Sequence, residues 1–184
     1  MITTYSGQLV RIRPFASEAE WAGFTREYAV MPNAHRGPQW YFANSALQVW
    51  NLFPTEETVC RFAVDRLDTG ELAGVITCGL GRWQLSGFTG TGLLERHWHN
   101  GFGREAKLLA SCHLFENFPI ESLWSDTVAT HSRAIAGLEA IGYRFAGILA
   151  CAFPSQGEYE GQVWYQLLRK DWERMDYRQE VRRS

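Results

Sequence analysis

The sequence is poor in cysteine, in net charge and in long apolar runs, and each shortage excludes a class of protein. Its four cysteines form no CxxC pair, which argues against a zinc knuckle or a redox motif. Each lies in an apolar run, so we expect reduced, buried thiols at Cys60, Cys78, Cys112 and Cys151. The 18 lysines and arginines and the 20 aspartates and glutamates give a net charge of −2, which argues against a nucleic-acid partner.

No apolar stretch approaches the roughly 20 residues of a membrane span. The first residues are polar, unlike a signal peptide. We therefore expect a cytoplasmic protein with no membrane partner and no bound metal. The 184 residues, 46% of them hydrophobic, predict one domain over 1–184.

Aromatic residues are plentiful, at 14% of the chain with eight tryptophans. Several cluster early, including Trp21, Phe24, Tyr28, Trp40 and Tyr41. Such density is typical of a packed core, and it also lines pockets for small or planar ligands.

Hydrophobic periodicity predicts seven strands and four helices. We expect strands at 9–14, 58–66, 71–81, 88–94, 121–128, 143–153 and 161–169. We expect one helix opened by a capping box at Ser17 and Glu20, and others at 39–52, 103–118 and 130–141. The first strand would turn Leu9 and Ile12 to one side, and the charged tail 171–184 would form a short helix. This order predicts an α/β (α+β mixed) fold with a mixed sheet flanked by helices.

The segment from Trp98 to Ala106 carries the most chemical information. Gly101 and Gly103 lie between a predicted strand and a predicted helix. Glycines there turn backbone N–H groups toward one point, at the positive end of the helix dipole, which predicts an anion site for phosphate. The spacing matches neither a Walker loop nor a dinucleotide fingerprint. A plain strand-to-helix turn explains the glycine pair equally well.

Four motifs in order resemble the GNAT N-acyltransferase superfamily. Its acyl-CoA motif, (Gln/Arg)-x-x-Gly-x-(Gly/Ala), is similar to Trp98-x-x-Gly101-x-Gly103, and the following Arg104-Glu105-Ala106 resembles the RimJ/RimL-type branch that acetylates ribosomal-protein N-termini. The family's opening strand, its Gly-Phe corner and its closing strand resemble 9–15, 140–143 and 164–172.

This resemblance implies a GNAT-like fold: a mostly antiparallel mixed sheet of about seven strands and four helices, splayed between strands 4 and 5. Acetyl-CoA would be the co-substrate, and a backbone N–H of the fourth strand would be the oxyanion donor. The implied cofactor contacts are Leu93, Leu94, Glu95, Trp98, His99, Asn100, Gly101, Phe102, Gly103, Arg104 and His131. The amine would enter from the other side, where we expect a pocket formed by Tyr28, Trp40, Tyr41 and Trp164.

The proton-transfer positions depart from the family pattern. His131, Ala134 and Leu138 stand where relatives often carry Asn, Ser and Tyr, and 88–94 holds no carboxylate. His131 and Asp126 are the candidate catalytic residues. Alternatively, His131 caps a helix and Asp126 bonds a backbone turn. A mechanism without a strong base, in which proximity supplies most of the acceleration, also fits.

The sequence thus predicts an acyl-CoA-dependent N-acyltransferase, most simply an acetyltransferase that works by direct attack of a primary amine in a ternary complex. No cysteine neighbours a predicted base, which disfavours an acyl-enzyme. The acceptor is a small amine or a protein N-terminus, and the protein a monomer or homodimer. The alternative is a catalytically weak or inactive acyl-CoA-binding protein that acts as a sensor or interaction module.

Overall fold

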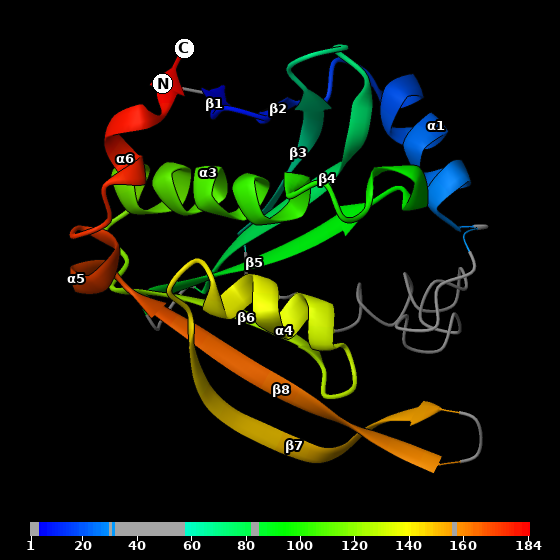
Figure 1. Cartoon of the computed structure of the whole chain (residues 1–184), viewed down its shortest axis with the longest axis vertical. Helices are drawn as coiled ribbons and strands as arrows, with labels where there is room; N and C mark the ends of the chain where they lie inside the picture. The colour runs from blue at the N-terminus through cyan, green and yellow to red at the C-terminus, as the bar shows by residue number, and fades with distance from the viewer. Residues whose placement is uncertain (1–3, 30, 32–57, 82–84, 156–157) are drawn as a thin grey trace.

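The computed structural model describes residues 4–29, 31, 58–81, 85–155 and 158–184 (Figure 1). Within these residues nine strands form one sheet in the order β7-β8-β6-β5-β4-β3-β2-β1-β9. Neighbouring strands run antiparallel except β5 and β6, which are parallel. The predicted helix at 39–52, with Trp40 and Tyr41, lies outside the described residues. The predicted mixed, mostly antiparallel α/β fold is confirmed.

All seven predicted strands are present, with ends shifted by up to three residues. The strands are β1 Tyr5–Ser6, β2 Val10–Pro14, β3 Thr58–Arg66, β4 Leu72–Gly81, β5 Ser86–Leu93, β6 Ser122–Val128, β7 Arg144–Ser155, β8 Glu158–Leu168 and β9 Arg182–Arg183. The two strands that the sequence did not predict, β1 and β9, pair with each other near the chain ends. Their pairing continues through mutual 3.0 Å backbone hydrogen bonds between Thr4 and Ser184.

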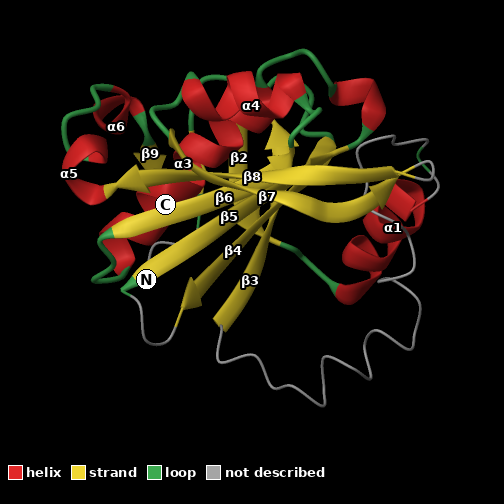
Figure 2. Cartoon of the chain, turned by 90° about the horizontal axis from the view of Figure 1, so that it is seen from below, coloured by secondary structure: helices red, strands yellow, loops and turns green. Residues whose placement is uncertain are grey.

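The helices lie on both faces of the sheet. They are α1 Glu18–Ala29, the 3-10 helix η2 Glu95–His97, α3 Phe102–Asn117, α4 Ser132–Glu139, α5 Arg169–Trp172 and α6 Tyr177–Glu180. Helices α3 and α4 cover one face, and α1 lies on the other side (Figure 2). The predicted capping of α1 is present, because the Glu20 N–H donates to Ser17 Oγ at 3.1 Å. None of the described helices has the length and apolar content needed to span a membrane.

The main core packs α3 against the sheet. Leu109, Cys112 and Phe115 are buried on α3. The prediction that Leu9 faces inward with Ile12 was wrong: Leu9 is 42% exposed, whereas Val10 and Ile12 are fully buried. The strand begins at Val10, so its alternation turns Val10 and Ile12 to the core.

The described thiols are those of Cys60, Cys78 and Cys112, and all three are free, as predicted. Cys78 and Cys112 are buried as expected, whereas Cys60 is half-buried. Cys60 and Cys78 face each other across β3 and β4.

Strands β5 and β6 separate along their length. They pair only from Ser86 to Phe88 on β5 and from Ser122 to Trp124 on β6. Beyond these positions no further register pair joins the two described strands. The predicted splay is therefore present, and it begins at Thr89 and Ser125.

Candidate active site

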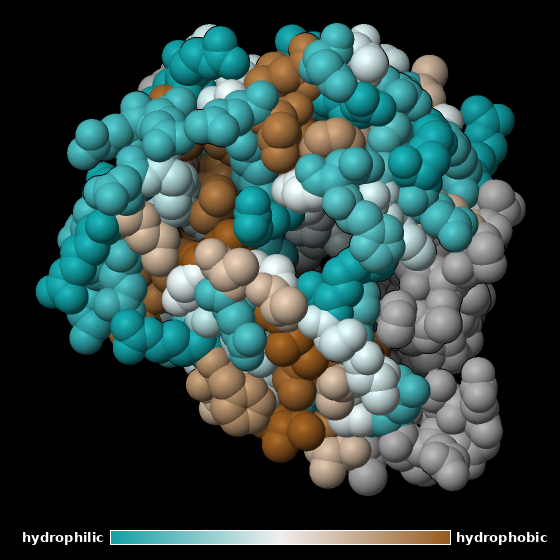
Figure 3. All heavy atoms as spheres, viewed as in Figure 1, coloured by the Kyte–Doolittle hydropathy of each residue, from teal (hydrophilic) through white to brown (hydrophobic). Residues whose placement is uncertain are grey.

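A cavity of about 560 Å³ occupies the splay. From one face it is lined by residues of α3 and α4, such as Lys107 and Leu138, and from the other face by Tyr28 and Asp126. Viewed from the side of α3 and α4, the surface is hollowed between these two helices (Figure 3). The cavity therefore joins the two faces of the sheet, and its size is that of a small-molecule site.

The loop before α3 leaves main-chain donors at one end of this cavity. His99 and Gly101 have left-handed backbone conformations, with φ of 64° and 79°. No side chain caps α3, and its first intrahelical hydrogen bond is donated by the Glu105 N–H to the Gly101 carbonyl. The N–H groups of Phe102, Gly103 and Arg104 precede that bond, so they and the helix dipole favour an anion here.

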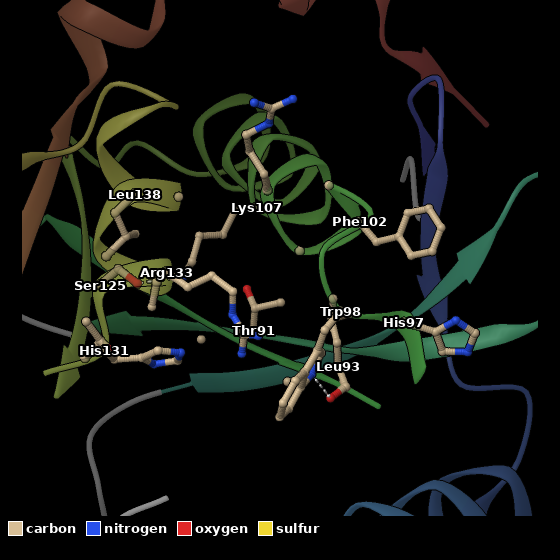
Figure 4. Close-up of a pocket in the computed structure, with 18 of the residues that line it drawn as sticks. Thr91, Leu93, His97, Trp98, Phe102, Lys107, Ser125, His131, Arg133 and Leu138 are labelled. Atoms are coloured by element: carbon tan, nitrogen blue, oxygen red, sulfur yellow. Dashed lines mark hydrogen bonds between the residues drawn. The ribbon is translucent and has the colours of Figure 1, made fainter. Parts of the chain in front are cut away.

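Trp98 fastens this loop to the neighbouring elements. Its indole N–H donates to the Leu93 carbonyl oxygen at 3.0 Å, at the end of β5 (Figure 4). The Arg133 guanidinium of α4 lies 4.3 Å from the centre of the indole ring, and its Nη1 lies 3.3 Å from His99 Nε2. The Arg133 guanidinium thus lies beside the helix N-terminus, and its charge reinforces the preference for an anion.

Glu105 explains another part of the loop motif. Its carboxylate accepts hydrogen bonds from the backbone N–H groups of Gln8, Leu9 and Val10, at 2.8, 2.7 and 2.6 Å. These charge-assisted bonds tie α3 to the turn before β2. Glu105 therefore holds the scaffold together and does not face the anion site.

Lys107 reaches the closed end of the splay. Its Nζ lies 3.0 Å from the Thr89 carbonyl oxygen, 3.2 Å from Thr89 Oγ1 and 2.6 Å from Ser125 Oγ. Burial lowers the pKa of Lys107 to about 8, and the nearby Asp126 charge opposes that shift. Figure 4 shows the side chain extending from α3 toward Ser125, while Leu138 approaches from α4.

The two predicted catalytic residues, Asp126 and His131, lie near each other in the sequence, at the end of β6 and the start of α4. His131 occupies the N-cap position of α4 without a side-chain capping bond, and its Nδ1 lies 3.2 Å from Thr127 Oγ1. Asp126 is exposed on β6, accepts a hydrogen bond from the Gln162 amide, and stands opposite Trp164 in the β6–β8 register. Ser125 points toward α3, so the alternation of the strand turns Asp126 to the α1 face.

A family model for the acetyltransferase (GNAT) domain matches residues 10–144. The chain belongs to the GNAT family. The predicted family and the predicted class of acyl-CoA-dependent N-acyltransferase are thereby confirmed. No curated protein sequence gives a significant match.

Solved GNAT structures share the fold at low identity. RimJ from Mycobacterium smegmatis, solved with CoA-disulfide, has a TM-score of 0.73 at 14% identity over 96% of this chain and 92% of its own. A chimera of spermidine N-acetyltransferase SpeG from Vibrio cholerae and hSSAT has a TM-score of 0.75 at 16% identity, over 91% and 100%. A GNAT-family acetyltransferase from Bacillus anthracis has a TM-score of 0.71 at 15% identity, over 91% and 99%.

Most of the predicted site residues of this GNAT domain do line the cavity. They are Tyr28, Leu93, Trp98, His99, Gly101, Phe102, Gly103, Arg104, Asp126 and His131. Leu94, Glu95, Asn100 and Trp164 are not among the lining residues. Leu94 is 2% exposed, and its N–H donates to the Ala73 carbonyl of the sheet.

The sequence interpretation missed several lining residues, including Thr91, His97, Lys107, Ser125 and Arg133. One signal for Lys107 was available. Gly103, Lys107 and Ser111 recur every four residues, so they form a stripe of small and polar side chains beside the apolar face of α3. In the described part of the chain, no group of three His, Cys, Asp or Glu side chains could hold a metal ion.

Proposed function

We propose that this GNAT domain transfers the acetyl group of acetyl-CoA directly to a primary amine within a ternary complex. The observation that carries the proposal is the cavity through the splay, which has anion-binding N–H groups at one end and the Asp126 carboxylate on the other face of the sheet. A donor and an acceptor that entered from opposite faces would meet inside it, and no covalent acyl-enzyme is needed.

The residues of the α3 face fit acetyl-CoA. The pyrophosphate would bind the N–H groups of the first turn of α3, beside Arg104 and Arg133. A Cβ atom at Gly103 would lie 3.3 Å from Leu93 Cδ1, so glycine keeps the entrance to the gap open. The pantetheine arm would run between β5 and β6, past His131.

Main-chain donors of β5 face the gap. The Thr89 and Leu93 carbonyls accept side-chain hydrogen bonds there, while the Leu94 N–H pairs with β4. The alternation of an antiparallel strand therefore turns the N–H groups of Thr91 and Leu93 toward the gap as well. Either N–H would stabilise the oxyanion that forms on the thioester carbonyl.

The α1 face fits an amine that carries an apolar group. Asp126 would attract the ammonium form, which loses one proton to solvent before it can attack, and would accept the second proton as the nitrogen bonds to the thioester carbon. Trp164 beside it, together with Tyr28 of the aromatic stack on α1, would pack against the apolar part. These features favour a small molecule over a protein N-terminus as the acceptor.

The rival function is an acyl-CoA sensor without turnover. Ala134 and Leu138 favour it, because both line the cavity at positions where relatives often carry a proton donor. Release of free CoA thiol from acetyl-CoA, measured with a panel of small amines and with N-terminal peptides, separates the two functions.

Thermal unfolding with acetyl-CoA tests the cofactor site on its own. With a Kd of ~10 µM and 1 mM ligand, the stabilisation is about 2.7 kcal/mol, which is a melting shift of several degrees. A shift without thiol release would support the sensor. No shift with acetyl-CoA, CoA or longer acyl-CoAs would contradict both functions.

A further inference from the structure

Lys107 lies at the point where β5 and β6 stop pairing. The last paired residues of the two strands are Phe88 and Trp124. Thr89 and Ser125 come next, and the Lys107 ammonium bonds both of them. Lys107 therefore closes the inner end of the gap that would hold the thioester.

The environment of the ammonium is unusual for a structural cation. Its three hydrogen-bond partners are a carbonyl and two hydroxyls, and none of them is charged. A neutral donor would join Thr89 to Ser125 without the desolvation cost of a buried charge. The charge at this position therefore lowers the stability of the folded protein, and a role in the reaction would explain why it is present.

The presence of lysine and not arginine at this position also favours a role in the reaction. The chain has sixteen arginines and only two lysines, Lys107 and the exposed Lys170. Arginine keeps its proton at all physiological pH values, whereas a buried lysine can lose it near neutral pH. The one enclosed cation in the described splay is thus the basic residue type that can give up a proton.

We propose that Lys107 is the proton donor to the CoA sulfur. The inference rests on the proposed function and adds a catalytic residue to it. The amine nitrogen forms a bond to the thioester carbon while its own proton passes to Asp126. The C–S bond breaks, the sulfur keeps the electron pair, and it takes a proton from Lys107 Nζ. Solvent then returns a proton to the neutral lysine and accepts one from Asp126.

The groups around Lys107 are consistent with this role. Leu138 and Ala134, which replace the hydroxyls often found in relatives, line the same cavity and leave the sulfur without another nearby donor on α4. The other titratable groups around the ammonium include Asp126, whose charge favours the protonated lysine, together with Cys78 and Tyr143. His131 and Arg133 line the same cavity. Contact with Cys60 and burial raise the pKa of Cys78, and burial raises the pKa of Tyr143 to about 12. Both therefore stay neutral at pH 8.

The pKa values of the proton donor and of the thiol that receives the proton are also similar. The ordinary pKa of a cysteine thiol is about 8.5, and that of Lys107 is about 8. Similar pKa values of the proton donor and the thiol that it forms favour general acid catalysis. Lys107 would then impose an alkaline limb near pH 8 on the rate of thiol release.

Two substitutions in the full-length protein separate proton donation from a structural role. Lys107→Gln keeps a hydrogen-bond donor for Thr89 and Ser125 but has no proton to transfer, and Lys107→Met removes both properties. Lys170→Gln is the matched control on an exposed lysine. Thiol release with the amine acceptor, acetyl-CoA Kd and melting temperature are measured for each protein from pH 6 to 10.

We expect Lys107→Gln to lower kcat by about a hundredfold and to remove the limb near pH 8, while acetyl-CoA Kd and melting temperature stay close to those of the starting protein. Lys107→Met should lose the same activity even if it is less stable. An active starting protein with an equally active Lys107→Gln variant would overturn the proton donor and leave the transferase function standing. A starting protein that binds acetyl-CoA but releases no thiol with any amine would overturn both.

Discussion

The Trp98 indole nitrogen lies 3.0 Å from the Leu93 carbonyl oxygen, so one side chain of the loop before α3 bonds the last residue of β5 directly. Trp98→Phe would remove this bond and keep a ring for Arg133 to stack on. We expect acetyl-CoA Kd to rise about fivefold, the equivalent of one hydrogen bond of ~1 kcal/mol. Isothermal titration calorimetry measures the effect, and an unchanged Kd would show that the loop holds its shape without the bond.

Gly103→Val should abolish the thermal stabilisation by acetyl-CoA. The reason is steric, because Gly103 has an ordinary helical backbone and its Cβ would point toward Leu93 and Thr91 across the entrance of the gap. Gly23→Val on α1 is the matched control, since a Cβ there meets no atom within 4 Å. If Gly103→Val keeps the full melting shift while Gly23→Val behaves like the starting protein, the pyrophosphate binds elsewhere.

His131→Asn tests whether His131 transfers protons. Asparagine restores the residue common in relatives and suits the N-cap position of α4, where His131 makes no capping bond. With Lys107 as the proton donor, we expect kcat to change by less than threefold and stability to rise by ~1 kcal/mol. A hundredfold loss of kcat together with the loss of a limb near pH 6.5 would instead assign the proton transfer to His131.

Glu105→Gln should destabilise the fold without affecting the chemical step. The substitution removes the charge that accepts three backbone N–H groups, and we expect unfolding to become easier by about 2 kcal/mol. Glu121→Gln is the control, because its side chain is 72% exposed and lies 3.9 Å from Arg169. Urea denaturation gives the stability, and kcat should match that of the starting protein. A large fall in kcat at full stability would show that Glu105 acts on the reaction.

The pKa of Lys107 also predicts how stability depends on pH. Burial lowers it from the ordinary value of 10.5 to about 8, so between these values the unfolded chain binds a proton that the folded protein does not. The free energy of unfolding should therefore rise with pH through this window, relative to Lys107→Met, by at most ~3 kcal/mol. Below pH 8 the cost of the buried charge is fully present. Denaturation of both proteins at pH 7 and pH 10 measures the change, and a constant difference would contradict the lowered pKa.

The sequence predicted the elements whose periodicity is strong. The β3–β4 hairpin and α3 were found within one residue at each end, because alternation and helical spacing are clear there. Strands β1 and β9 were missed because each has two residues, too few for a period. Only the pairing of the two chain ends makes them strands.

The site was predicted unevenly for a related reason. The proposed anion site in the loop around Gly101 depends on backbone geometry, which the spacing of the glycines indicates. Lys107 was missed because lysine in an amphipathic helix usually points to solvent. The Lys107 side chain can point inward because β5 and β6 separate beneath α3. That separation arises from tertiary structure and leaves no pattern in the local sequence.

The splay gives this sheet two edges in its interior. Exposed strand edges invite pairing with other chains, and proteins normally cover or charge them. Here the unpaired parts of β5 and β6 face each other across a gap that residues of α3 and α4 line. A ligand that ran between them would act as a surrogate strand and would couple β1–β5 to β6–β8. The backbone amide hydrogens that face the gap, such as those of Thr91 and Leu93, should then exchange quickly in the free protein and slowly once the gap is filled.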